Sequence, residues 1–301
     1  MVVIGGPTAA GKSALALELA ERLGGEIVSA DSRQVYREFD IGTAKPGEAE
    51  RARVPHALID VAEPTETYTV ARYREAATAA IAAAHAAGRL PLLVGGTGFY
   101  IRAVLGGTPI PEVAPDPERR AWLMAQPDLH ARLQALDPES AARLHPNDRF
   151  RLARAIEVVT ATGRPLATFK AEAAPYRVVY LVAALPPDDL AARIAARTEQ
   201  MLAAGWRDEV ARLVAKYGPA LPLLRTLGYA ELVAEMAGEA TAAEATERIV
   251  RNTRRYARRQ LTWFRAERSA HWLDMAGRGN LKAWIDAAIA EIRPLLEAGP
   301  G

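Results

Sequence analysis

The sequence contains no cysteine in its 301 residues, and this absence removes several kinds of site. Disulfide bonds, thiolate zinc centres and cysteine nucleophiles are all excluded. Histidine is also scarce, and the few that occur are too scattered to form a metal-ligand cluster: His56, His85, His130, His145 and His271. The sequence therefore indicates neither a disulfide-stabilised protein nor a centre built from histidine and cysteine.

Long hydrophobic runs are missing as well, since no apolar stretch reaches the roughly 18 residues needed to span a membrane. No basic segment followed by an apolar stretch begins at Met1, so we expect no secretory leader. The 38 basic and 36 acidic residues give a net charge of +2, which neither implies nor excludes a nucleic-acid partner. We expect a cytoplasmic monomer with no membrane partner.

Short apolar runs alternate with helical periods in the first third of the chain, and one more apolar run follows later. The predicted strands cover residues 2–5, 26–30, 57–61, 90–94 and 177–184, and the predicted helices cover residues 12–23 and 69–88. Buried strands separated by helices indicate a parallel sheet covered on both faces. Such sheets bind ligands at the carboxyl ends of their strands.

A proline-rich, mostly helical stretch interrupts this pattern. Helices are expected near residues 128–136, 138–144 and 148–162, and the chain after about residue 188 is expected to be helical. The sequence thus predicts an α/β fold, a P-loop NTPase-like parallel sheet flanked by helices. We expect residues 1–108 and 175–301 to form this core and residues 109–174 to form a helical insertion domain.

One segment, GPTAAGKS, fits the phosphate-binding pattern GxxxxGKS without a mismatch. It follows an apolar strand and opens a helix, the context that such a loop (P-loop) requires. Its glycines let backbone N–H groups point inward, and the helix N-terminus adds partial positive charge. The lysine would reach phosphate oxygens, and the serine hydroxyl would bind Mg²⁺. The predicted phosphate-binding residues are Gly6, Pro7, Thr8, Ala9, Ala10, Gly11, Lys12 and Ser13, with Ser13 as the metal ligand.

Two aspartates are candidates for a further acidic group at the sheet. Asp31 follows the strand IVSA and precedes Ser32, Arg33 and Gln34, so it is expected to face the ligand crevice. Asp60 lies within its apolar run, and a structural role for it is as reasonable as a catalytic one.

Six segments together resemble the bacterial tRNA dimethylallyltransferases, in the order of that family. They are GPTAAGKS (6–13), SADSRQVY (29–36), DIGTAKP (40–46), LLVGGTGFY (92–100), LHPND (144–148) and RRQLTWFR (258–265). The resemblance implies transfer of a dimethylallyl group from its diphosphate to the exocyclic amine of the adenosine 3′ of the anticodon, with Mg²⁺ as cofactor. The P-loop would then hold the diphosphate leaving group rather than a transferred phosphoryl group.

The resemblance also implies roles for individual residues. Asp31 matches the proposed general base, Thr97 a residue near the reacting amine, and Arg197 an arginine that stabilises the diphosphate. The adenosine would have to be flipped out of the RNA to reach such a site. Phe150 departs from the polar residue expected at its position in the family. The implied tRNA-binding residues are Asp31, Ser32, Arg33, Gln34, Thr97, Pro111, Phe150, Arg151, Leu152, Ala153, Arg154, Arg225, Thr226, Gly228 and Tyr229.

An arginine-rich run covers residues 248 to 268, with eight arginines and one glutamate. Arginines on one helix face, interleaved with aromatic residues, suit phosphate contact and base stacking. The face would carry Arg251, Arg254, Arg255, Arg258 and Arg265.

Two alternatives remain for the function of the whole chain. One is a nucleoside or small-molecule kinase that uses ATP through the same loop, and the other is an isopentenyltransferase for free adenine nucleotides, a class without the insertion.

Overall fold

The computed structural model describes residues 1–111, 113–114, 116–171, 175–276 and 281–297. The chain divides into two compact units. The larger unit contains residues 1–104 and 175–301, and the smaller one contains residues 105–174. The two are described separately below.

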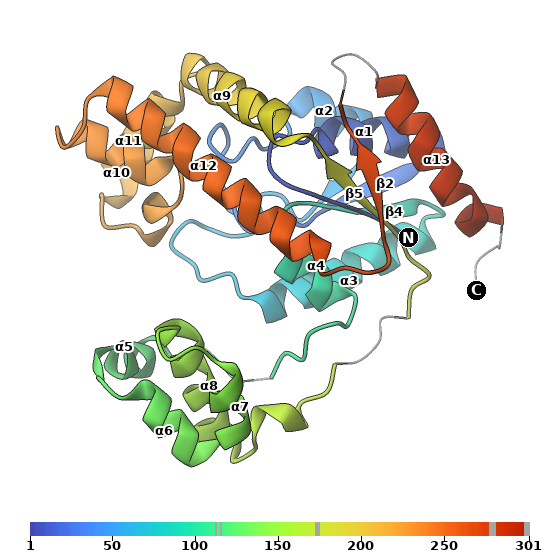
Figure 1. The fold of residues 1–301 in the computed structure, drawn as a ribbon. Coiled ribbons are helices and arrows are strands. Elements are labelled where there is room, and N and C mark those ends of the chain that lie inside the picture. The colour runs from blue at the N-terminus through green and yellow to red at the C-terminus, as the bar shows by residue number, and fades with distance from the viewer. Residues whose placement is uncertain (112, 115, 172–174, 277–280, 298–301) are drawn as a thin grey trace. The chain divides into compact units, whose positions relative to one another are not determined.

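The larger unit contains a six-stranded sheet in the order β3-β2-β4-β1-β5-β6 (Figure 1). Every strand pairs in parallel with its neighbours. The strands are β1 (Val2–Gly5), β2 (Gly25–Ser29), β3 (His56–Ala57), β4 (Leu90–Val94), β5 (Val179–Ala184) and β6 (Ala270–Asp274). Because all carboxyl ends lie at one edge, the loops after β1, β2, β4 and β5 meet there.

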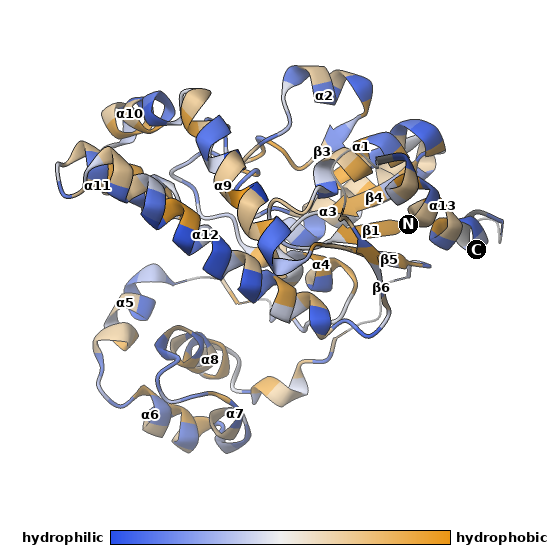
Figure 2. Ribbon diagram, turned by 45° about the horizontal axis from the view of Figure 1, so that its top comes forward, coloured by the Kyte–Doolittle hydropathy of each residue, from blue (hydrophilic) through white to orange (hydrophobic). Residues whose placement is uncertain are grey.

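Helices connect and cover these strands. They are α1 (Lys12–Leu23), α2 (Glu48–Arg53), α3 (Val70–Ala86), α4 (Gly98–Val104), α9 (Pro187–Ala203), α10 (Trp206–Tyr217), α11 (Tyr229–Met236), α12 (Ala242–Arg265) and α13 (Leu281–Glu297), with a short 3₁₀ helix, η2, at Pro222–Arg225. Helices α1 and α13 pack on each other and on the sheet, and α3 packs on α4, β2 and β4. Figure 2 shows the inner strands β1, β4 and β5 as hydrophobic, as expected for the part of a sheet that is buried on both faces.

Helix α12 packs against the sheet and against helices α9 and α11. Its apolar side includes Ile249, Ala257 and Phe264, which are buried. A side chain on Gly5 would approach the Phe264 ring to 2.5 Å, so the helix lies directly against β1. The helix also contacts α4, α9 and α11. This packing brings residues of α12 to the edge where the strand ends meet.

The smaller unit is built from four helices and a 3₁₀ turn: α5 (Pro117–Ala125), α6 (Leu129–Leu136), α7 (Pro138–Arg143), α8 (Arg149–Thr162) and η1 (Leu166–Thr168). It has its own apolar core, formed by Leu123, Leu129, Leu133, Ala141, Leu152, Ala153, Ala155 and Ile156. The side chains of Asp116, Asp137 and Asp148 cap three of the helices by accepting backbone N–H bonds.

Two sequence predictions about the sheet are wrong. The strand expected at 57–61 is limited to His56–Ala57, because Leu58 and Asp60 have φ of 64° and 58°, which extended backbone does not allow. The chain after residue 188 was expected to be helical, yet β6 forms at Ala270–Asp274 and pairs with β5. Helices α2 and α4 were not predicted, and α5 lies in the stretch that was expected to be mostly helical, where no separate helix was predicted for it.

Asp60 has a structural contact set. Its carboxylate pairs with Lys45 at 2.6 Å and with Arg51 at 2.9 Å, and these hydrogen bonds lower its pKa against the effect of burial. Asp60 lines neither of the cavities described below. Of the two roles considered for this residue, the contacts favour the structural one.

None of the described helices combines the length and the apolar character that crossing a bilayer requires.

Candidate active site

The P-loop forms a cradle between β1 and α1. Gly6 has a φ of 136°, and a side chain there would meet the carbonyl oxygen of Ala183 at 2.4 Å. Gly11, with a φ of 94°, precedes the first residue of α1. Both positions need glycine, because other residues rarely adopt these backbone angles. The first-turn amides of α1 have no carbonyl partner inside the helix, so they are available to an anion.

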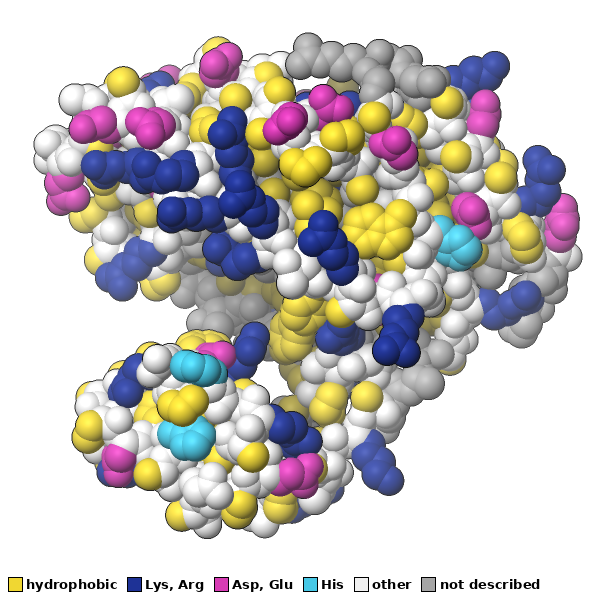
Figure 3. Space-filling view, in the orientation of Figure 1, with side chains coloured by type: hydrophobic (Ala, Val, Ile, Leu, Met, Phe, Trp, Pro, Cys, Tyr) yellow, Lys and Arg dark blue, Asp and Glu magenta, His cyan; other side chains and the backbone are white. Residues whose placement is uncertain are grey.

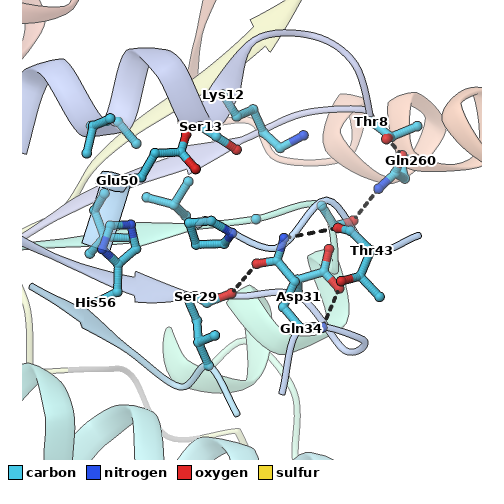
Figure 4. A pocket seen from close by; sticks show the side chains of 18 of the residues that line it. Thr8, Lys12, Ser13, Ser29, Asp31, Gln34, Thr43, Glu50, His56 and Gln260 are labelled. Atoms are coloured by element: carbon cyan, nitrogen blue, oxygen red, sulfur yellow. Dashed lines mark hydrogen bonds between the residues drawn. The ribbon is translucent and has the colours of Figure 1, made fainter. Parts of the chain in front are cut away.

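One amide of the P-loop is already occupied. The backbone N–H of Thr8 donates to Oε1 of Gln260 at 2.9 Å, while Nε2 of Gln260 donates to the carbonyl of Gly96 at 2.9 Å (Figure 4). Gln260 is buried in α12 and so ties the P-loop to the loop that follows β4. The Thr8 amide therefore does not point freely at a ligand, although Thr8 still lines the cavity. Gln260 lies in the segment RRQLTWFR, and its role in this contact is not evident from the sequence.

Lys12 extends along this cradle. Its Nζ donates to the carbonyl oxygen of Pro7 at 2.6 Å. Burial and the nearby Arg197 guanidinium lower the pKa of Lys12 to about 7, although Asp31 acts in the opposite direction. Among the described residues, Nζ of Lys12 has this carbonyl partner but no ion pair. A phosphate group would supply one.

Arg197 reaches the same region from α9. Its guanidinium has no hydrogen bond or ion pair with any residue that the structure describes. Burial lowers the pKa of Arg197, and Asp31 partly offsets this effect. Two basic side chains thus face one cavity with a single carboxylate, Asp31, and this excess of basic groups suits an anionic ligand.

Asp31 follows β2, where the sequence places it. Its Oδ1 accepts the backbone N–H of Arg33 at 2.8 Å and that of Gln34 at 3.4 Å, so the residue forms a turn. No described residue donates to Oδ2. The turn fixes the carboxylate in the cavity and leaves one oxygen for a substrate.

Thr97 follows β4 and contacts the turn that carries Asp31. Its Oγ1 accepts the backbone N–H of Ser32 at 3.1 Å, and its own N–H donates to the carbonyl of Ala30. Thr97 lines neither cavity. In this structure it holds the turn that carries Asp31, and the direct contact with the reacting amine stays a prediction.

Gln34 is engaged in a similar way. Its Nε2 donates to the carbonyls of Thr43 and Ala44, and its Oε1 accepts the hydroxyl of Ser29 at 3.1 Å (Figure 4). The side chain lines the cavity, but its polar atoms are already satisfied by the protein. It therefore connects the Asp31 turn with the 40–46 loop.

Two cavities of the larger unit meet at Asp31. The first, the cradle cavity, includes Lys12 and Ser13, and the second, the outer cavity, includes Ser32, Arg33 and Arg225. The residues that line both are Thr8, Asp31, Thr43, Arg197 and Tyr256. A phosphate-binding cavity and a second opening thus share one junction, with a carboxylate and a guanidinium in it.

The outer cavity collects several predicted tRNA-binding residues. Thr226 and Tyr229 line it beside exposed Arg225, and the ring of Trp206 forms part of its wall. Gly228 does not line the cavity but packs behind it, since a side chain at this position would meet the Trp206 ring at 2.1 Å. Gly228 thus allows close packing. Trp206 and Thr43 had no predicted role, since their positions depend on contacts between distant segments. Tyr256 is one of the aromatic residues interleaved with the arginines of the 248–268 run, for which the sequence predicts base stacking, and its side chain lines both cavities.

The predicted residues of the smaller unit separate into exposed and internal ones. Phe150 is 60% exposed, and the Arg151 side chain is 70% exposed. Leu152 and Ala153 are fully buried in the core of that unit, so their side chains pack inside it, and their contact with tRNA stays a prediction. Arg154 pairs with buried Glu157 and donates to the carbonyl of Val113, as a structural residue does. Pro111 is half-buried in a loop.

Helix α12 presents several arginines of the 248–268 run along one side, whereas Arg259 of the same run lines the outer cavity. Glu247, Val250, Arg251, Arg254, Arg255 and Arg258 line a groove along the helix. Figure 3 shows cationic side chains gathered there. Arg251 pairs with Glu247, but the guanidinium groups of Arg254, Arg255 and Arg258 have no ion pair among the described residues. Phe264, in contrast, belongs to the core.

The donor set of the cradle cavity suits Mg²⁺. Ser13 is exposed at the start of α1 and lines the cavity together with Lys12 and Asp31. Mg²⁺ is commonly held by one or two protein oxygens together with substrate phosphates. A hydroxyl and a carboxylate beside a phosphate cradle fit that pattern.

These features define an α/β protein with a parallel sheet, a P-loop and two adjoining cavities at the carboxyl ends of its strands. The family model for IPP transferase matches residues 34–267, and that for isopentenyl transferase matches residues 1–62. The chain therefore belongs to the IPP transferase family.

Individual relatives are similar over nearly their full length. A tRNA dimethylallyltransferase of Gloeobacter violaceus is 54% identical over 94% of this chain and 95% of its own. Among solved structures, the tRNA isopentenylpyrophosphate transferase of Bacillus halodurans is 36% identical, with a TM-score of 0.72 over 99% of this chain and 98% of the other. A eukaryotic dimethylallyltransferase described as acting on tRNA is 25% identical, with a TM-score of 0.86 over 100% of this chain and 80% of the other.

Proposed function

We propose that this chain transfers a dimethylallyl group from dimethylallyl diphosphate to N6 of the adenosine 3′ of the anticodon in tRNA. The products are N6-dimethylallyladenosine and diphosphate. The observation that carries the proposal is the junction at which the cradle cavity and the outer cavity share Asp31 and Arg197. Family membership and relatives named tRNA dimethylallyltransferase support the same reaction. A tRNA substrate agrees with the cytoplasmic location that we expect.

The cradle cavity suits the leaving group. The bond from C1 of the allyl group to the diphosphate oxygen breaks, and negative charge develops on that oxygen. Lys12, Arg197 and the first-turn amides of α1 would stabilise this charge in a site partly removed from water. Mg²⁺ on Ser13 would neutralise further charge on the diphosphate when bound. In this reaction the diphosphate leaves intact, and no phosphoryl group is transferred.

Asp31 suits the other half of the reaction. The adenine amine is a weak nucleophile because its lone pair is delocalised into the ring. As its nitrogen bonds to C1, Oδ2 of Asp31 would take the proton that the amine loses. Oδ1 remains bound to two backbone amides, which hold the carboxylate in place.

The RNA is proposed to enter through the outer cavity. The adenosine, flipped out of its stack, would pass Arg33, Arg225 and Thr226 to reach Asp31. Outside the cavity, the groove on α12 offers three arginines without ion-pair partners among the described residues, which would bind backbone phosphates. In the smaller unit, exposed Phe150 and Arg151 remain candidates for RNA contact, Phe150 by stacking. We propose that the protein acts as a monomer.

The test is incubation with dimethylallyl diphosphate, Mg²⁺ and unmodified tRNA, followed by mass analysis of the nucleosides. We expect N6-dimethylallyladenosine, and we expect no product with Lys12→Met or with EDTA. Parallel reactions contain AMP in place of tRNA, or ATP with small acceptors. Modified AMP without modified tRNA would indicate the adenine-nucleotide enzyme, and release of ADP with a small acceptor would indicate a kinase. Either result would refute the proposal.

A further inference from the structure

Glu209, in α10, is a buried carboxylate that the proposed chemistry does not use. It is 2% exposed and lines neither cavity. Its Oε2 accepts the backbone N–H groups of Asp40 and Ile41 at 3.1 and 2.7 Å. Its Oε1 accepts the N–H of Gly42 at 3.3 Å and the hydroxyl of Tyr229 at 2.7 Å. Four donors thus replace the water that the carboxylate loses on burial.

The donors belong to two segments that form the outer cavity. Gly42 lines this cavity, and Thr43, the next residue, lines both cavities. Tyr229 begins α11 and lines the outer cavity from the other segment. Burial next to Glu209 raises the pKa of Tyr229 far above its ordinary value, so its hydroxyl remains a donor. One carboxylate therefore connects two walls of the same opening.

The packing around these segments leaves little freedom for another arrangement. A side chain on Gly42 would meet Nε1 of Trp206 at 2.2 Å and the Tyr229 ring at 2.6 Å. The Tyr229 ring also lies 4.8 Å from that of Phe39 and 5.7 Å from that of Trp206, measured between centroids. Gly42 thus lies directly against an aromatic cluster. Glu209 supplies the polar contacts that hold the 40–42 backbone there.

We propose that Glu209 is a positioning residue for the tRNA side of the reaction. It fixes the 40–43 loop and Tyr229 so that the outer cavity has its binding shape before RNA arrives. This inference rests on the proposed function, because it takes the outer cavity to be the entrance for the flipped adenosine. Preformed walls reduce the ordering that binding would otherwise require.

The main variant is Glu209→Gln, which keeps the size but places an NH₂ group against at least one donor. Hydrogen exchange of the 40–42 amides should accelerate by about tenfold or more, and kcat/KM for tRNA should fall by about tenfold, the scale of one lost hydrogen bond to a charged group. The Kd for dimethylallyl diphosphate with Mg²⁺ should change less than about twofold, because the cradle cavity does not contact Glu209.

Glu235→Gln is the matched control. Glu235 lies in α11 and pairs with Arg207 of α10 at 2.8 Å, so it joins the same two helices without touching the loop. We expect unchanged exchange of the 40–42 amides and near-normal kcat/KM for tRNA. Tyr229→Phe removes only one of the four hydrogen bonds and should give a smaller loss of kcat/KM, with the loop amides still protected.

Several results would overturn the inference. One is normal kcat/KM for tRNA in Glu209→Gln despite fast exchange in the loop. Another is an equal loss of diphosphate and tRNA binding, which a general loss of stability would cause. If Glu209→Gln does not fold, Tyr229→Phe decides, and an unchanged kcat/KM for tRNA would count against the inference. If the wild type transfers nothing to tRNA, the proposed function fails instead, and hydrogen exchange still reports the loop contact.

Discussion

The protonation of Lys12 gives a prediction that can be measured without tRNA. Its pKa of about 7 means that roughly nine in ten free molecules carry a neutral Lys12 at pH 8. A bound diphosphate favours the charged ammonium group. Binding at pH 8 should therefore take up close to one proton per diphosphate, since phosphate groups with a pKa of about 6 are already ionised there.

The same argument gives the pH dependence of affinity. Above pH 7, each pH unit lowers the protonated fraction of the free protein about tenfold, which costs about 1.4 kcal/mol of binding free energy. Because about half of the free protein is protonated at pH 7, the Kd for dimethylallyl diphosphate should rise about 50-fold between pH 7 and pH 9 if the ammonium charge is essential.

Calorimetric titration at pH 8 in Tris and in HEPES measures the proton directly, because the observed enthalpy differs by the ionisation enthalpy of the buffer for each proton. Lys12→Arg is the control, since a guanidinium is charged throughout this range and should bind without uptake. Lys12→Met should bind weakly and without uptake. Equal enthalpies in both buffers for the wild type would refute the reasoning.

Three further predictions follow from the structure. Asp31→Asn should lower the single-turnover rate by about 10²- to 10⁴-fold with tRNA binding nearly unchanged; weak tRNA binding with normal chemistry would make Asp31 a recognition residue. Arg254→Ala and Arg255→Ala should each reduce the slope of log affinity for tRNA against log salt by about 0.7 to 0.9, whereas Arg22→Ala on α1 should not; unchanged slopes would separate these arginines from RNA. In urea unfolding of the free protein, the free energy of unfolding should increase from pH 7 toward pH 10 relative to Lys12→Met. The reason is that Lys12 keeps its proton in the unfolded chain over this range but loses it in the native state. Equal pH dependence of the two proteins would contradict the lowered pKa of Lys12.

Local motifs were sufficient to predict the centre of the fold. Residues 2–5 and 12–23 form β1 and α1 as expected, and the family and fold class agree with the sequence analysis. These features depend on a short apolar run, a glycine pattern and helical periodicity within about 20 residues. The placement of Asp31 at a strand end needs no more than the same information.

Other features depend on contacts that a single sequence does not show. Gln260 accepts a hydrogen bond from the backbone N–H of Thr8, which lies 252 residues away in the chain. Glu209 accepts one from the N–H of Ile41, which lies 168 residues away. Strand β6 has one buried residue, Leu273, so it lacks the apolar run by which the other strands were recognised. Arg154 looked like its neighbour Arg151 in the sequence, and only the fold shows that it contacts Glu157 and the carbonyl of Val113.

The position of β1 in the sheet has a consequence for synthesis on the ribosome. β1 pairs with β4 on one side and with β5 on the other, yet residues 95 to 178 separate these two partners in the chain. One edge of β1 therefore keeps unpaired N–H and C=O groups until the smaller unit has been made, and such edges are open to pairing with other chains. A smaller unit that folds early on its own core would bring β5 back within reach of that edge sooner than an extended segment could.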